Sequence, residues 1–92
     1  MKLRYKARAL GHVKAIHGYI VQNDPAAALR VVRRIEYSIN RLAILPFSGR
    51  PGVVPGTRIL VVPGLPYVVI YRTRETEVDI IAVLHTSRRR RS

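Results

Sequence analysis

Apolar residues recur at helical spacing in the first half of the chain. Residues 25–45 place one at every third or fourth position, which puts these side chains on a single face of a helix. The predicted buried stripe consists of Ala28, Val32, Ile35, Ile39 and Leu42. Asp24 can cap this helix, Pro25 suits its first turn, and Pro46 ends it. The pattern therefore predicts a long amphipathic helix.

A shorter helix is predicted before it, over residues 9–22. Its apolar stripe comprises Leu10, Val13, Ile16, His17 and Ile20. Because His17 falls within that stripe, we expect it to be a hydrogen-bonded core residue. Only residues 23 and 24 separate the two helices, so they are expected to pack as an antiparallel hairpin.

The second half of the chain changes to strand patterns. Residues 57–62, 67–72 and 77–85 are rich in β-branched and aromatic side chains and are separated by short turns, which predicts a three-stranded antiparallel meander. One face of the last strand is expected to carry Val78, Ile80, Ala82 and Leu84. Residues 3–7 alternate apolar and basic side chains, as in a short strand. The predicted fold is α+β, in the order βααβββ, with the helical hairpin on one face of the sheet.

Length and composition narrow the organisation and the setting. The chain has 92 residues, of which 48% are hydrophobic, and contains no cysteine. We expect one domain over residues 1–87, followed by a basic tail over residues 88–92. The lack of cysteine fits a reducing compartment, and no stretch has the apolar length of a signal sequence or a membrane span. A cytoplasmic protein with no membrane association is therefore expected.

The net charge of +12 points to acidic partners. Residues 1–45 carry nine basic and two acidic side chains, a net of +7, whereas residues 46–87 contribute +1 and the arginines at positions 88–91 add +4. The polar side of the long helix carries Arg30, Arg34 and Arg41. Nucleic acid or an acidic protein segment would relieve the repulsion among these charges.

Few combinations of side chains could support catalysis. The three histidines have no nearby carboxylates to complete a metal site, so neither a metal nor another cofactor is expected. What remains is a basic and phenolic set at the predicted sheet, namely Arg58, Tyr67, Tyr71, Arg72, His85 and Arg88. Arginines can clamp phosphates, and His or Tyr can move protons during RNA cleavage. Each of these residues also has an ordinary structural role in or beside a strand.

Several short motifs occur in a fixed order along the chain. The second half contains SGRPG at residues 48–52, PGTRILVV at 55–62, GLPYVVIYR at 64–72 and IAVLH at 81–85. The first half contains Ala9-Leu10, IHGYI at residues 16–20, Pro25 at the start of the long helix and Leu45-Pro46 at its end. This series covers nearly the whole chain and resembles the ParE/RelE toxins of bacterial toxin–antitoxin systems. Members of that family share the βααβββ arrangement.

The resemblance implies a partner and a choice of two targets. The partner is an antitoxin whose acidic or amphipathic C-terminal segment wraps the toxin in a hetero-oligomer. ParE-like members inhibit DNA gyrase and trap its DNA-cleaved state, whereas RelE-like members cleave messenger RNA in the ribosomal A site. The motifs at residues 55–58 and 64–67 resemble the ParE branch. RelE-like nucleases carry an arginine where this chain has Val68, and a basic pair in the strand that here contains residues 60–62.

These arguments give two sets of candidate residues. Those expected to meet a partner are Arg30, Arg34, Arg41, Arg58, Tyr67, Tyr71 and Arg72. If the chain is instead a metal-free endoribonuclease, the catalytic candidates are Arg58, His85 and Arg88. A plain nucleic-acid-binding module is a third alternative, and its binding would weaken steeply with salt. The motifs favour the gyrase-inhibiting toxin, which is not itself an enzyme.

Overall fold

Eight elements follow one another along the chain in a computed structural model, which describes residues 1–89. In order they are β1 (Lys2–Tyr5), α1 (Ala7–Val21), α2 (Pro25–Arg41), β2 (Arg50–Pro51), β3 (Thr57–Val61), β4 (Tyr67–Thr73), β5 (Glu77–His85) and α3 (Thr86–Arg89). The predicted βααβββ order is confirmed. Strand β2 and helix α3 were not predicted, because each is too short to show a hydrophobic period. The basic tail predicted to start at residue 88 begins inside α3, and residues 90–92 lie outside the described residues.

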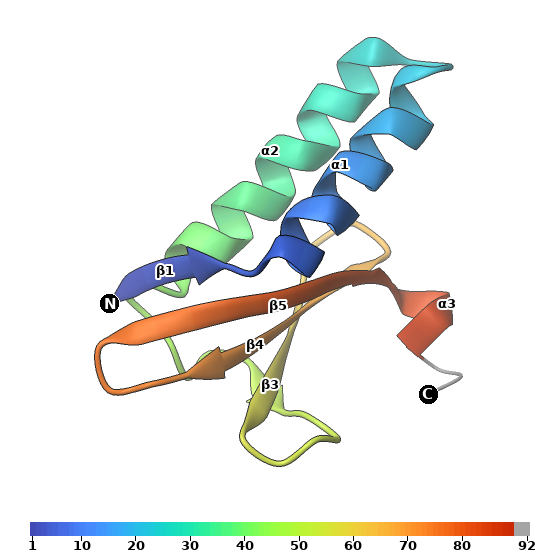
Figure 1. Ribbon diagram of the computed structural model, residues 1–92. Coiled ribbons are helices and arrows are strands. Elements are labelled where there is room, and N and C mark those ends of the chain that lie inside the picture. The colour runs from blue at the N-terminus through green and yellow to red at the C-terminus, as the bar shows by residue number, and fades with distance from the viewer. Residues whose placement is uncertain (90–92) are drawn as a thin grey trace.

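The five strands form one mixed sheet in the order β1-β5-β4-β3-β2 (Figure 1). Strands β3, β4 and β5 make the predicted antiparallel meander. Strand β1 pairs parallel with β5, with Leu3 opposite Val78, so the first strand joins the last one. A parallel neighbour requires a long connection, and here it contains both helices and strands β2–β4.

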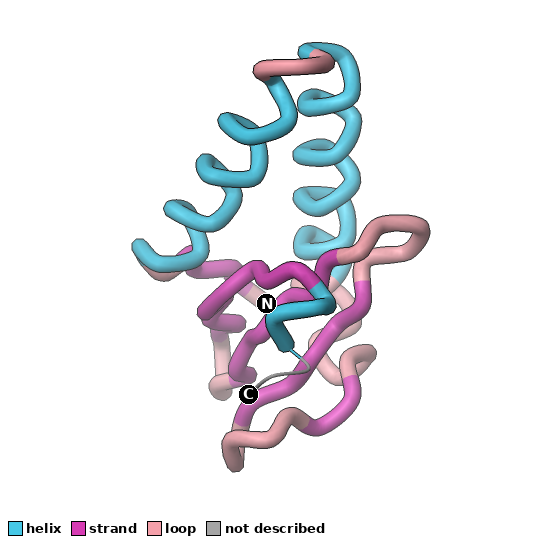
Figure 2. The backbone as a smooth tube through the Cα atoms, turned by 90° about the vertical axis from the view of Figure 1, so that its right-hand side faces the viewer, coloured by secondary structure: helices cyan, strands magenta, loops and turns pink. Residues whose placement is uncertain are grey.

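The helical hairpin covers one face of the sheet and extends past it (Figures 1 and 2). The predicted cap of α2 is confirmed, because the Asp24 carboxylate accepts a hydrogen bond from Ala27 N at 2.9 Å and Pro25 occupies the first turn. Helix α2 ends at Arg41, four residues before the predicted end at residue 45. Hydrogen bonds from Leu42 N to Ile39 O and from Ala43 N to Asn40 O tighten this last turn and close the helix before Pro46 is reached.

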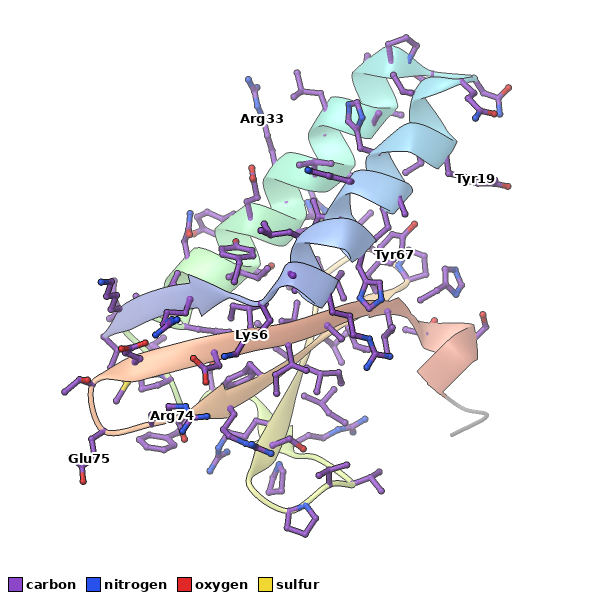
Figure 3. All side chains as sticks on the ribbon, in the orientation of Figure 1. Lys6, Tyr19, Arg33, Tyr67, Arg74 and Glu75 are labelled. Carbon is purple, nitrogen blue, oxygen red and sulfur yellow. The ribbon has the colours of Figure 1, made fainter. Side chains whose placement is uncertain are left out.

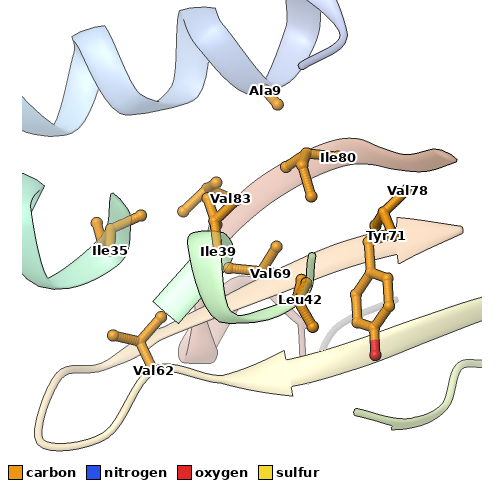
Figure 4. Packing of buried hydrophobic residues seen from close by; sticks show 10 residues of the cluster. All are labelled: Ala9, Ile35, Ile39, Leu42, Val62, Val69, Tyr71, Val78, Ile80 and Val83. Atoms are coloured by element: carbon orange, nitrogen blue, oxygen red, sulfur yellow. The ribbon is translucent and has the colours of Figure 1, made fainter. Parts of the chain in front are cut away.

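The core lies between the helices and the sheet (Figure 4). Its buried members are Ala9, Ile35, Ile39, Leu42, Val62, Val69, Tyr71, Val78, Ile80 and Val83. The stripe predicted for α1 was displaced by about one residue, because the inward line runs through Ala9, Val13 and Ile16. Leu10 and His17 lie at the side of that line and are exposed. The prediction that His17 is a core residue is therefore wrong.

An irregularity in β5 changes which side chains face the helices. Ile70 pairs with Ala82 but Tyr71 pairs with Ile80, so Ile81 is an extra residue in β5. The alternation of side chains between the two faces of the sheet shifts by one residue there. Val83 therefore joins Val78 and Ile80 in the core cluster. The prediction of one continuous face through Ala82 and Leu84 is wrong for this reason.

His12 on α1 holds the strand just after this bulge. Its Nδ1 accepts a hydrogen bond from the backbone N–H of Val83 at 3.1 Å. Val83 is 2% exposed, so water cannot replace the bond easily. The contact fastens α1 to β5 at the point where the regular ladder is interrupted.

We expect His12→Ala to destabilise the protein by about 1–3 kcal/mol, because it leaves the buried Val83 N–H without its acceptor. Urea unfolding near pH 7.5 measures this difference. His17→Ala is the matched control, since it removes an exposed histidine from the same helix and is expected to change stability by less than about 0.5 kcal/mol. Equal losses from the two substitutions would contradict the role given to His12.

Asp79 in β5 joins the parallel edge of the sheet to the β4–β5 turn. It is 3% exposed, and its carboxylate accepts a hydrogen bond from Arg74 Nε at 2.5 Å and lies 4.0 Å from Lys6 Nζ. Lys6 and Arg74 lie near the same stretch of β5 in Figure 3. The Arg74 hydrogen bond lowers the pKa of Asp79 against the opposing effect of burial, and Lys6 lowers it further.

Because the folded-state pKa of Asp79 is depressed, its stabilising contribution is complete above the unfolded pKa of about 4 and is lost as pH falls through the folded value. We expect the unfolding free energy of the parent protein to fall more steeply below about pH 4 than that of Asp79→Asn. Urea midpoints measured across a pH series test this. The exposed Glu75→Gln is the control and should keep the parent slope. Parallel curves for parent and Asp79→Asn would refute the assignment.

Candidate functional site

A groove of about 740 Å³ lies between helix α2 and the β3 side of the sheet. Helix α2 contributes one wall with Arg30, Arg33, Arg34, Tyr37, Ser38 and Arg41. The opposite side is formed by Ser48, Leu60, Val61 and Pro63. The α2 residues are spaced by three, four and seven positions, which brings them to one face of the helix. We call this feature the arginine groove.

The arginine groove combines a cationic wall with an apolar floor. Four arginines line it, and no acidic side chain does so among the described residues. Glu36, the one carboxylate of α2, lines a different hollow together with Tyr5. Leu60 and Pro63 provide apolar surface, and Val61 is 51% exposed. A segment with carboxylates on one side and apolar side chains on the other complements this surface.

A close turn shapes one end of the groove. The Nη1 atom of Arg34 donates to Pro63 O at 3.4 Å, which ties α2 to the β3–β4 turn. Gly64 in that turn has a φ of +76°. Glycine suits this backbone angle, and a Cβ added to Gly64 would lie 2.8 Å from Arg34 Nη1 and displace the end of that side chain.

Tyr71 fixes the loop at the other end of the groove. It is fully buried, its hydroxyl donates to Pro46 O at 2.9 Å, and it accepts from Gly49 N at 2.9 Å. A Cβ on Gly49 would lie 2.6 Å from the Tyr71 hydroxyl, so this packing requires glycine. The loop that carries Ser48 to the groove is thereby held against the core.

Arg58 supports the same loop from β3. Its Nη1 donates to Gly49 O at 2.6 Å, and its guanidinium lies 5.1 Å from the centroid of the Phe47 ring. Arg58 is thus already engaged by its own chain. Arg58 and Tyr71 therefore act first as parts of a loop clamp, which we define as Tyr71, Arg58, Gly49 and Pro46.

The structure brings only some of the predicted partner-binding residues together. Arg30, Arg34 and Arg41 share the arginine groove. Tyr71, predicted to meet a partner, is instead fully buried in the core, and its side chain has no exposed surface. Arg72 follows it in β4 and points to the opposite face of the sheet. Tyr37 and Ser38 were missed, although their spacing from the arginines on α2 could have revealed them.

Tyr67 and His85 form a separate pair where β4 begins and β5 ends. The two residues are opposite each other in the ladder, and their rings meet edge to face with centroids 5.5 Å apart. Burial raises the pKa of the Tyr67 phenol, and the neighbouring Tyr19 raises it further. Tyr67 therefore stays protonated at neutral pH and is a poor general base.

The nuclease candidates do not converge on one point. Arg58 on β3 is opposite Tyr71, and His85 on β5 is opposite Tyr67. Arg58 and His85 are therefore separated by two inter-strand spacings across the sheet and four residues along it, which is roughly 16 Å. His85 Nδ1 lies 2.8 Å from Ser87 Oγ and accepts from Ser87 N at 3.2 Å. The side chain of Arg88 lies outside the described part of the chain.

Within residues 1–89, no group of three or more His, Cys, Asp or Glu side chains is placed to hold a metal ion. None of the helices there has the length and apolar character needed to cross a bilayer.

Comparison with known proteins agrees with this architecture. The chain is 43% identical over 84 residues to the protein Y4kP of Sinorhizobium fredii, covering 91% of this chain and 86% of the relative. It is 36% identical over 81 residues to toxin RelE2 of Caulobacter vibrioides, covering 88% and 90%. A solved chain of the chromosomal ParDE system from P. aeruginosa superimposes with a TM-score of 0.84 at 27% identity, covering 92% and 95%.

The family match spans almost the whole chain. Residues 3–90 match the family described as the ParE toxin of the type II toxin–antitoxin system parDE. The resemblance inferred from the motifs is confirmed, and with it the fold; membership of a toxin–antitoxin family implies an antitoxin partner. The chain belongs to the ParE toxin family of type II toxin–antitoxin systems.

Proposed function

We propose that this toxin arrests growth by binding and inhibiting DNA gyrase, with no chemical step of its own. The observation that carries the proposal is the separation of Arg58 from His85, each already engaged by its own chain, within a member of the ParE family. A nuclease needs its phosphate clamp and its proton-transfer group within reach of one scissile bond. A binding protein has no such requirement.

The positions at which RelE-like nucleases carry basic residues support the same proposal. Val68 is 2% exposed and Val62 is fully buried. Leu60 and Val61, beside Val62, line the arginine groove. Burying an unpaired charge at the two core positions would cost several kcal/mol or more, so they suit apolar side chains and not catalytic ones.

The antitoxin is proposed to neutralise the toxin by placing an acidic, amphipathic segment in the arginine groove. Support comes from the four arginines with no acidic neighbour in the lining, and from the overall charge of +12. Carboxylates of such a segment would relieve the repulsion along α2. The resulting complex is a hetero-oligomer, and both proposed partners place the toxin in the cytoplasm.

A second candidate function is ribosome-dependent cleavage of messenger RNA. It is favoured by the 36% identity to the protein named RelE2 and by the basic residues near the sheet. The catalytic candidates would then be Arg58, His85 and Arg88. A substrate would have to rearrange the loop clamp and the His85–Ser87 contact before these groups could act together.

Purified toxin is expected to block DNA supercoiling by gyrase and to accumulate cleaved DNA. Supercoiling assays with increasing toxin measure the first effect, and linear product after protein removal measures the second. Toxin already bound to its antitoxin is the control and should be inactive. Normal supercoiling at saturating toxin, together with A-site cuts in primer extension on translated message, would replace this function with the nuclease alternative.

The double variant Arg30→Glu/Arg34→Glu is expected to bind the antitoxin about 10- to 100-fold more weakly, because it reverses two charges of the arginine groove. Isothermal titration at about 0.1 M salt measures the change. Arg8→Glu/Lys14→Glu is the matched control, since it alters net charge equally at exposed positions of α1. Equal weakening by both variants would mean that only overall charge matters, and the groove assignment would fail.

A further inference from the structure

The face of the sheet away from the helical hairpin, which we call the far face, carries basic side chains in register. Residues that pair directly across neighbouring strands share a face of the sheet. Asp79 on β5 has Arg4 opposite it on β1 and Arg72 opposite it on β4. Tyr71, the neighbour of Arg72, lies in the core, so the alternation of side chains directs this row away from the helices. Arg4 and Arg72 therefore flank Asp79 on the far face.

Three more cations belong to the same face. Lys2 and Lys6 precede and follow Arg4 by two positions, which puts them on the same side of the chain as Arg4. Lys6 Nζ lies 4.0 Å from Asp79 Oδ2. Arg74 reaches back from the β4–β5 turn, and its Nε donates to the same carboxylate oxygen at 2.5 Å. We call these side chains the cationic sheet face: Lys2, Arg4, Lys6, Arg72 and Arg74.

The carboxylates near this face are too few to neutralise it. Glu77 and Asp79 lie on β5, and Glu75 lies in the adjoining turn. Five cations and three carboxylates leave this surface with a net charge of +2. Lys2 and Arg72 form no ion pair with any residue that the structure describes. Repulsion among the cations lowers stability unless an anion from outside the chain relieves it.

Asp79 holds the cations in place without covering them. Its side chain is 4% exposed, whereas those of Arg4, Lys6 and Arg74 are 59%, 48% and 56% exposed. Within the described residues, the Arg74 guanidinium makes its hydrogen bond through Nε. Its two terminal nitrogens are therefore available to an outside acceptor such as a phosphate oxygen. The buried carboxylate thus orients cations whose outer ends meet solvent.

The spacing of these cations suits the sugar–phosphate backbone of DNA. The three cations at the β1 edge recur at every second residue, roughly 7 Å apart, and Arg4 and Arg72 are two strand spacings, roughly 10 Å, apart. A regular array of this kind contacts successive phosphates without reading the bases. An acidic protein segment also needs apolar anchors, which the arginine groove provides. Between Arg4 and Arg72 the sheet offers only the carboxylate of Asp79.

We propose that the cationic sheet face binds the phosphate backbone of duplex DNA, and that in the gyrase complex it rests on the DNA segment held by the enzyme. The placement at gyrase rests on the proposed function, whereas binding of DNA by the toxin alone does not. The face includes the β1 edge of the sheet, whereas the arginine groove adjoins β3 near the other edge. A toxin that contacts enzyme and DNA together stabilises the complex of the two.

Arg4→Gln/Arg72→Gln tests the DNA contact, because it removes two cations and leaves Lys6 and Arg74 beside Asp79. The probe is a fluorescent DNA duplex of about 20 base pairs, titrated with toxin in the absence of gyrase and followed by anisotropy. Binding is expected to weaken about 10- to 100-fold at about 0.1 M salt, and the slope of log affinity against log salt to fall by about 2. Arg8→Gln/Lys14→Gln is the control with equal net charge and should keep the parent slope.

A measurement on the parent protein keeps the test valid if the double variant does not fold. Added duplex is expected to shift the amide NMR signals of residues 2–6 and 72–79 and to leave those of α2 in place. Equal weakening by both variants, or shifts confined to α2, would overturn the cationic sheet face as a DNA site. Full gyrase inhibition by a variant that no longer binds the duplex would overturn its placement at gyrase. If the parent binds the duplex through this face but does not inhibit gyrase, the proposed function fails and the DNA site stands.

Discussion

The packing of α2 on the meander is the constraint from which the rest of the structure follows. Ile35, Ile39 and Leu42 are fully buried, in one cluster with core residues of β3–β5. Once that stripe faces inward, helical geometry sets the direction in which every other side chain of α2 leaves the helix. Arg34 and Arg41 must then lie beside the edge of the sheet. The cationic wall of the groove is thus a direct result of burying the opposite side of the helix.

The loop between α2 and β3 depends on a second, polar constraint. One buried phenol, that of Tyr71, accepts from the N–H of Gly49 and donates to the carbonyl of Pro46, and Arg58 donates to the carbonyl of Gly49. Buried polar groups stabilise a single conformation when all of them are paired. An arginine and a tyrosine that resemble catalytic residues in the sequence thereby serve to hold a glycine-containing loop at the mouth of the groove.

Local patterns were sufficient for the elements and insufficient for their contacts. The cap at Asp24 and the strand at Glu77–His85 depend on neighbours within a few residues, and both were predicted from the sequence. The face of α1 was misplaced because Ala9, a small residue, lies at the centre of the buried line while the larger Leu10 lies beside it. The bulge at Ile81 depends on the pairing of β5 with β4, which no local pattern reveals. His17 lies among apolar residues in the sequence and is nevertheless exposed. One wall of the groove was visible as an arginine pattern, but the other side comes from Ser48 and from residues 60–63, which no local pattern links to α2.

The parallel pairing of β1 with β5 has a consequence for the making of the protein. Leu3 finds its partner Val78 only after 75 further residues have been synthesised. Contacts so distant in sequence are slow to form, and no earlier strand can substitute for β5. A chain still on the ribosome therefore holds its helical hairpin with the apolar face of α2 incompletely covered, and the sheet closes only when the last strand emerges. The sheet is thus completed only after β5 has been made, and a copy truncated before β5 leaves β1 without its partner strand.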